Sequence, residues 1–166
     1  MRITPIQTAK TMAHCEAPVS ELRVVVPYTT PGLTRTALRY VAAFGDLEVN
    51  VVLIDAHVVP FPVPVSEPTV SREFLEERLR TAAEETTLPT AAKLMFTRNR
   101  VEALRKVLKP GSLVVIAASS WWWFSAERKL ARLLSKAGHE VVVVSVGNSG
   151  KSGVCRVSRP TVHLVR

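Results

Sequence analysis

The stretch LRVVVPYTTPG, residues 22–32, carries the signal that decides the fold. Its first six residues form an apolar run rich in β-branched side chains, which is typical of a buried parallel strand. Thr30 is suited to cap a helix and Pro31 to open it, because the first helical position needs no N–H donor. The apolar residues that follow recur along one helical face: Leu33, Ala37, Tyr40, Val41 and Phe44. The stretch therefore predicts a strand followed at once by a helix.

The same unit repeats along the chain. Further strands are predicted at residues 49–59, 92–97, 113–117 and 141–146. Between them, helices are predicted from Ser71, near residues 100–108 and at about residues 125–137, where Gly138 ends the last one. Strict alternation favours an α/β fold with a doubly wound, five-stranded parallel sheet that has helices on both faces. Such sheets bind ligands beyond the carboxyl ends of their strands.

Length and composition agree with one domain. The chain has 166 residues, of which 47% are hydrophobic. We expect a flexible segment at residues 1–20, the α/β domain at 21–146, and a basic tail at 147–166 with a further strand at 161–165. Two cysteines exclude a disulfide framework. No apolar tract predicts a transmembrane helix or a secretory signal, so a cytoplasmic location is expected.

Three stretches resemble the universal stress protein family. Residues 25–30, followed by 35–40, resemble its first strand, Val-Pro turn and first helix. Residues 56–60, AHVVP, resemble the end of its second strand. Residues 113–116, 125–128 and 141–144 resemble its fourth strand, last helix and closing strand. The resemblance implies the strand order 3-2-1-4-5, a role in the stress response and a homodimer formed through the fifth strands. The tail strand would alternatively cover that edge within one chain, or cross to the partner.

Two departures concern the nucleotide site that the resemblance implies. Nucleotide-binding members have an aspartate where this chain has Thr29, and a glycine-rich loop where this chain reads AASSWWWFS, residues 117–125. Glycines let backbone N–H groups approach phosphates, whereas tryptophans do not. We therefore expect no conventional ATP binding and no required cofactor. A vestigial site for AMP or another small anion remains, in the crevice between strands one and four: Tyr28, Thr29, Ser119, Ser120 and Ser125.

Trp121, Trp122 and Trp123 stand in that crevice segment. Three consecutive side chains cannot all face one way. One interpretation is a plug that fills the space of a nucleotide. A second is a dimer or partner interface, where tryptophan is enriched, and a third is stacking on an aromatic ligand.

No catalytic or metal-binding apparatus is predicted. His14, His57, His139 and His163 lack metal-ligand spacing. Asp55 and His57 would share one strand face and could pair, but no nucleophile accompanies them. Residues 145–152, SVGNSGKS, only partly imitate a phosphate-binding loop, because they begin with serine and precede a poor helix. We therefore expect a binding or regulatory protein, not an enzyme.

Charge is unevenly distributed. Residues 98–109 hold five basic groups and one acidic, and residues 127–136 hold four and one, whereas residues 71–85 hold three and five. The strand order implies that the third and fourth helices cover one sheet face, which should therefore be basic. This face is either a solvated surface or a docking site for an acidic protein, a membrane lipid or a nucleic acid. For an acidic protein partner, Arg105, Arg128 and Arg132 are the residues to test. Without aromatic interleaving, nucleic acid is a poorly supported partner.

Overall fold

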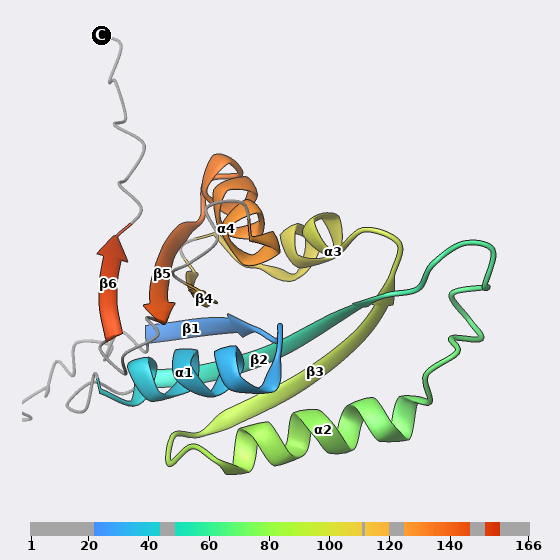
Figure 1. Cartoon of the computed structure of the whole chain (residues 1–166), viewed down its shortest axis with the longest axis horizontal. Coiled ribbons are helices and arrows are strands. Elements are labelled where there is room, and N and C mark those ends of the chain that lie inside the picture. The colour runs from blue at the N-terminus through green and yellow to red at the C-terminus, as the bar shows by residue number, and fades with distance from the viewer. Residues whose placement is uncertain (1–21, 44–48, 111, 120–124, 147–151, 157–166) are drawn as a thin grey trace, which may run out of the picture.

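The computed structural model describes residues 22–43, 49–110, 112–119, 125–146 and 152–156 (Figure 1). Strands and helices alternate along most of the chain, and the elements have these bounds: β1 Leu22–Pro27, α1 Pro31–Ala42, β2 Val49–Val58, α2 Arg72–Glu84, β3 Thr90–Thr97, α3 Arg100–Val107, β4 Leu113–Ser119, α4 Ala126–Lys136, β5 Glu140–Val146 and β6 Ser152–Arg156. The predicted α/β alternation is confirmed. The predictions for residues 1–20 and 161–165 concern residues outside the described ranges.

The sheet has the order β3-β2-β1-β4-β5-β6. The first five strands of that order are parallel, as predicted. The sixth strand was not predicted. It runs antiparallel to β5, from the pair Val142 and Arg156 to the pair Val146 and Ser152. The edge of β5 is therefore covered within the chain, and a homodimer made by pairing two fifth strands would require β6 to leave it.

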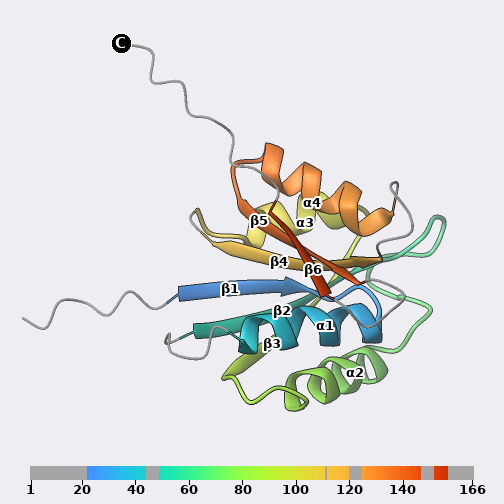
Figure 2. The ribbon, with the colours of Figure 1, turned by 60° about the vertical axis from the view of Figure 1, so that its left-hand side comes forward.

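The helices form two layers, one on each face of the sheet (Figure 2). Helices α1 and α2 pack over one apolar cluster, which includes Val26, Leu38, Leu53 and Leu79. Helices α3 and α4 pack over the other, which includes Ile54, Leu104, Ile116 and Leu134. Adjacent strand residues such as Leu53 and Ile54 enter opposite clusters, because successive side chains of a strand face opposite ways. The prediction that the third and fourth helices share a face is confirmed.

Helix boundaries follow local capping chemistry. Thr30, Ser71, Asn99 and Ser125 are the N-caps, and each accepts backbone N–H groups of the first turn. At the end of α4, Gly138 has φ +90°, and the N–H groups of Gly138 and His139 donate to the carbonyls of Ser135 and Leu134. This pattern needs a left-handed residue, which glycine supplies without a steric penalty.

The end of β2 and the start of β5 differ from the prediction by one residue, and two other strand limits differ by two residues. Strand β3 begins at Thr90, not at residue 92, because Thr90 and Ala91 continue the parallel ladder with Val51 and Val52 of β2. Strand β4 extends past residue 117 to Ser119. Its extra residues pair with Ser145 and Val146.

Candidate functional site

The predicted site residues that follow β1 have mainly structural contacts. Tyr28 is buried, with 2% of its surface exposed. The N–H of Thr29 donates to the hydroxyl of Thr34 at 3.2 Å, and Thr34 is itself buried in the first turns of α1. This bond fixes the turn between β1 and α1, and it leaves Thr29 half-buried at the carboxyl edge of the sheet.

The predicted serines are not brought into contact with Tyr28 or Thr29 by any hydrogen bond between described residues. Ser119 is exposed at the end of β4. The hydroxyl of Ser125 accepts the N–H of Arg128 at 3.3 Å, so it caps α4. Ser120 lies outside the described residues. So do all three tryptophans of the sequence, and their predicted roles stay untested.

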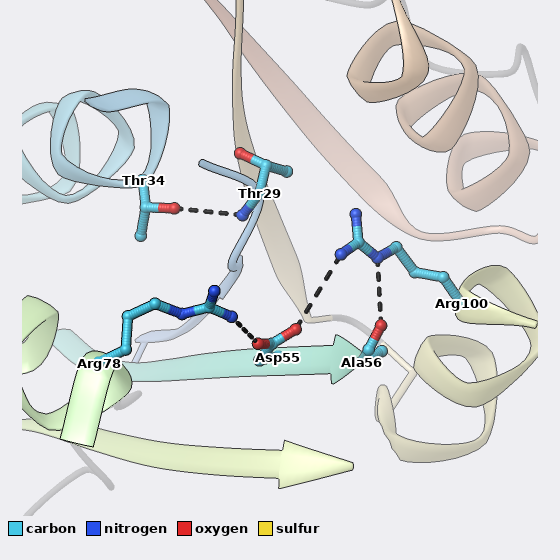
Figure 3. A network of polar contacts seen from close by, with 6 residues as sticks. All are labelled: Thr29, Thr34, Asp55, Ala56, Arg78 and Arg100. Carbon is cyan, nitrogen blue, oxygen red and sulfur yellow. Dashed lines mark hydrogen bonds and ion pairs between the residues drawn. The ribbon is translucent and has the colours of Figure 1, made fainter. Parts of the chain in front are cut away.

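A cluster that the sequence analysis did not anticipate lies at the carboxyl edge beside β1 (Figure 3). Its centre is Asp55 of β2, which is 1% exposed. The Nη2 atom of Arg78, from α2, donates to Oδ2 of Asp55 at 2.7 Å. The Nη2 atom of Arg100, from α3, lies 4.0 Å from Oδ1. The two arginines therefore reach one carboxylate from opposite layers of the fold.

The topology explains why Asp55 is accessible to both arginines. Strand β1 pairs with β2 only as far as Pro27 and Ile54. Beyond this point β2 pairs with β3 on its other side, and none of the described strands lies along the edge next to Asp55. Arg100 is the first residue of α3, and its Nε donates to the carbonyl of Ala56 at 3.2 Å. This bond holds the guanidinium over the end of β2.

The cluster carries an excess of positive charge. A buried carboxylate is costly without a counter-charge, and Arg78 supplies it directly. Arg100 brings a second positive charge, at a distance too long for a hydrogen bond. Each guanidinium side chain is 32% exposed. Two cations and one anion leave about one net positive charge at a solvent-accessible edge.

Tyr28 links this cluster to a groove. The guanidinium of Arg78 lies 4.5 Å from the centre of the Tyr28 ring, a cation–π arrangement. Burial raises the pKa of the Tyr28 phenol; Arg78 opposes this rise, and Asp55 adds to it. The phenol is therefore neutral at physiological pH.

The groove lies between α1 and α2 and has a volume of about 330 Å³. Tyr28 and Arg78 line it together with apolar groups that include Pro31, Phe74 and Ala82. Arg35 and Glu85 also line it, and they form a two-bonded ion pair in which both N–O distances are 2.6 Å. This volume falls in the range of small-molecule sites.

Arg98 fixes the loop that joins β2 to α2. Its Nη1 donates to the carbonyls of Val59 and Pro60 at 2.8 and 2.9 Å, and its Nη2 donates to the carbonyl of Val63 at 2.5 Å. Its guanidinium also lies 4.1 Å from the centre of the exposed Phe61 ring. Because this loop leads into α2, the contacts help to place Arg78 above Asp55.

The partners of Asp55 are arginines, not His57, with which the sequence analysis said it could pair. The His57 ring instead packs edge-on against Phe96 of β3, with 5.9 Å between ring centres. No group of histidine, cysteine, aspartate and glutamate side chains in the described part of the chain could hold a metal ion. Among the described helices, none has the length and apolar character needed to span a bilayer.

No family model matches the chain, and no curated protein does so either. Two solved structures are similar over most of its length. A crystal structure of E. coli MccB with succinimide shares 14% identity over 82% of this chain, with a TM-score of 0.44. The minor L-lactate dehydrogenase of Enterococcus mundtii shares 13% identity over 78%, with a TM-score of 0.35. The chain spans 42% and 38% of their lengths, and neither similarity bears on function.

Proposed function

We propose that the chain is a non-catalytic binding or regulatory protein that resembles the universal stress proteins and recognises a small anion at the carboxyl edge of its sheet. The proposed ligands are small anions, and AMP represents them in the experiments below. The observation that carries the proposal is the convergence of Arg78 and Arg100 on the single buried carboxylate of Asp55. The stress-response role and the cytoplasmic location remain part of this proposal and rest on the resemblance. The homodimer rests on it too, and pairing through the fifth strands would require β6 to leave the edge of β5.

Arg100 is the group best placed to receive the anion. It uses Nε on the carbonyl of Ala56, while its other nitrogens have no hydrogen bond within the described ranges. A guanidinium offers five N–H donors and binds phosphate or carboxylate through two of them. Arg78 is committed to Asp55 and serves mainly to neutralise it. A ligand on Arg100 would therefore meet an available cation next to the carboxyl ends of two strands, where such sheets bind ligands.

The neighbouring groove suits the rest of such a ligand. Its apolar walls and its volume of about 330 Å³ would accommodate a ring system of nucleoside size. Arg78 and Tyr28 belong to both the groove and the charged cluster. ATP in the pose typical of the resembled family is not part of the proposal, because residues 117–125 contain no glycine to cradle a triphosphate.

The test is thermal unfolding in the presence of AMP or inorganic phosphate. A ligand that binds only the folded state raises the melting temperature as its concentration increases. Arg100→Gln should weaken the affinity for AMP by about tenfold or more, because it removes a charge-assisted hydrogen bond. Arg105→Gln is the matched control: it removes the same charge from an exposed site on the same helix.

Equal weakening by both variants would mean that AMP responds only to overall charge, and the proposed site would be wrong. Unchanged melting of the wild-type protein at millimolar AMP and phosphate would overturn the proposed function itself.

A further inference from the structure

The helical layer formed by α3 and α4 carries a large positive charge. The two helices together contain seven arginines and lysines and two glutamates. Helices α1 and α2, on the opposite face, contain five and four. The layers face opposite directions (Figure 2), so the charge is concentrated on one side of the molecule.

Two of the three arginines of α2 pair with glutamates of the same helix. Arg72 pairs with Glu76 at 3.3 Å, and Arg80 pairs with Glu77 and Glu84. On α3, Lys106 pairs with Glu102 at 2.9 Å, and Arg100 lies 4.0 Å from Asp55 at the edge of the sheet. Four exposed cations of these helices, and Lys109 just after α3, have no ion pair with any described carboxylate. The four are Arg105, Lys129, Arg132 and Lys136.

The spacing of these cations makes them repel one another. On α4, Arg132 has Arg128 four residues before it and Lys136 four residues after it. Side chains at this spacing are neighbours on a helix surface, and like charges there are unfavourable. An anionic surface placed against the layer would relieve this repulsion. Arg128 contributes less to the outer face, because its Nη2 donates to Ser145 and its side chain is half-buried.

Leu133 gives the layer an apolar centre. It is 36% exposed and follows Arg132 directly, with Lys129 and Lys136 one turn away on either side. Neither helix contains an aromatic residue on which a nucleic acid base could stack. A single leucine also offers too little apolar surface to insert into a bilayer. An apolar residue ringed by cations is complementary to a protein segment with acidic and aliphatic side chains.

We propose that the outer face of α3 and α4 docks an acidic amphipathic segment of another protein, with Leu133 as the central apolar contact. The docking does not rest on the small-anion site, because that site lies at the carboxyl edge and uses Arg78 and Arg100.

The experiment is a binding titration by fluorescence anisotropy with the full chain and a labelled synthetic peptide that carries glutamates and a leucine stripe. Lys129→Gln combined with Arg132→Gln should weaken binding by about tenfold, whereas Arg39→Gln combined with Lys93→Gln removes equal charge from exposed sites elsewhere and should leave it nearly unchanged. Leu133→Ser should weaken binding of this peptide, but not of one whose leucines are replaced by glutamine. Added salt should weaken all of these complexes.

Two further probes test whether the outer face of α3 and α4 binds a nucleic acid or a membrane instead of a protein. They are a short DNA duplex, and vesicles of phosphatidylcholine with phosphatidylserine. Tighter binding of either probe than of the peptide, with the same sensitivity to Lys129 and Arg132, would overturn the choice of a protein partner. Absence of peptide binding at low salt, or equal weakening by the control pair of substitutions, would overturn the docking face.

Discussion

The two helical layers are built alike inside and differently outside. Each covers its sheet face with buried leucines, such as Leu79 of α2 and Leu134 of α4, and each has one helix that is capped by a serine. Their charges differ in use. The arginines of α2 form ion pairs with glutamates of the same helix and with Asp55. Most cations of α3 and α4 have no ion pair among the described residues.

This difference separates two kinds of information in the sequence. Apolar periodicity determines which side of a helix packs on the sheet, and both layers satisfy it equally. The charged positions determine whether the charges on the outer side are balanced by ion pairs within the layer or leave an excess of one sign. Arg78 is an exception in its layer, because it points into the fold and supports the buried carboxylate at the edge of the sheet (Figure 3).

The largest loss of folding stability should come from Arg78→Met. The substitution leaves Asp55 buried, with Arg100 at 4.0 Å as its remaining counter-charge. Breaking a buried pair costs about 3–5 kcal/mol, and the partial exposure of Arg78 reduces this to about 2–3 kcal/mol. Urea unfolding of the variant measures the loss. Arg80→Met, on the exposed side of the same helix, is the control and should change little; equal losses would contradict the distinction between inner and outer charges.

The next effect tests whether the layers are alike in local construction. Ser71→Ala and Ser125→Ala should each destabilise by about 1 kcal/mol, because each removes the side-chain acceptor that caps its helix. Denaturant unfolding measures both. Ser125→Ala should leave the affinity for AMP unchanged. A loss of affinity for AMP without a loss of stability would mean that Ser125 binds the anion, as the sequence predicted.

Charge reversal at one helix position should change the stability by a smaller amount, and in opposite directions in the two layers. Arg132→Glu places a negative charge between Arg128 and Lys136 and should stabilise the protein by about 0.5 kcal/mol. Glu76→Arg places a positive charge between Arg72 and Arg80 of α2 and should destabilise it by about 0.5 kcal/mol. Unfolding at low salt measures the pair, and molar salt should remove both effects. If both substitutions changed the free energy of unfolding in the same direction, the two layers would not differ in how their surface charges are paired.

The smallest effect concerns pH. The hydrogen bond from Arg35 holds the pKa of Glu85 below its ordinary range. Because the folded-state pKa is the lower one, the stabilisation is complete above the ordinary carboxylate pKa and disappears as the pH falls through the folded-state value. A double-mutant cycle with Arg35→Gln and Glu85→Gln should give a favourable coupling at neutral pH and none in strong acid. A coupling that survives in acid would rule out the ionic origin.

Most of the fold could be predicted from the sequence, because its signals are local. The valine run of β1, the Thr30 and Pro31 start of α1 and Gly138 after α4 each specify a conformation from neighbouring residues alone. Strand β6 was missed because its residues, SGVCR, lack an alternating apolar pattern; its place in the sheet follows from pairing with β5.

The candidate site was predictable only in part. Asp55 was named from the sequence only as a residue that could pair with His57, two positions away on the same strand face. Arg78 and Arg100 come from residues 23 and 45 positions further along the chain, and among 22 basic residues nothing marks them in advance. One signal was present: a charged residue within an apolar strand requires an opposite charge nearby.

A crystal structure of the protein grown with AMP would test the central claim most directly. The account predicts that the phosphate lies within hydrogen-bond distance of the Arg100 guanidinium, beside Asp55, with the nucleoside directed toward the groove between α1 and α2. An ordered nucleotide whose phosphate instead rests on residues 117–125, away from Arg100, would contradict it.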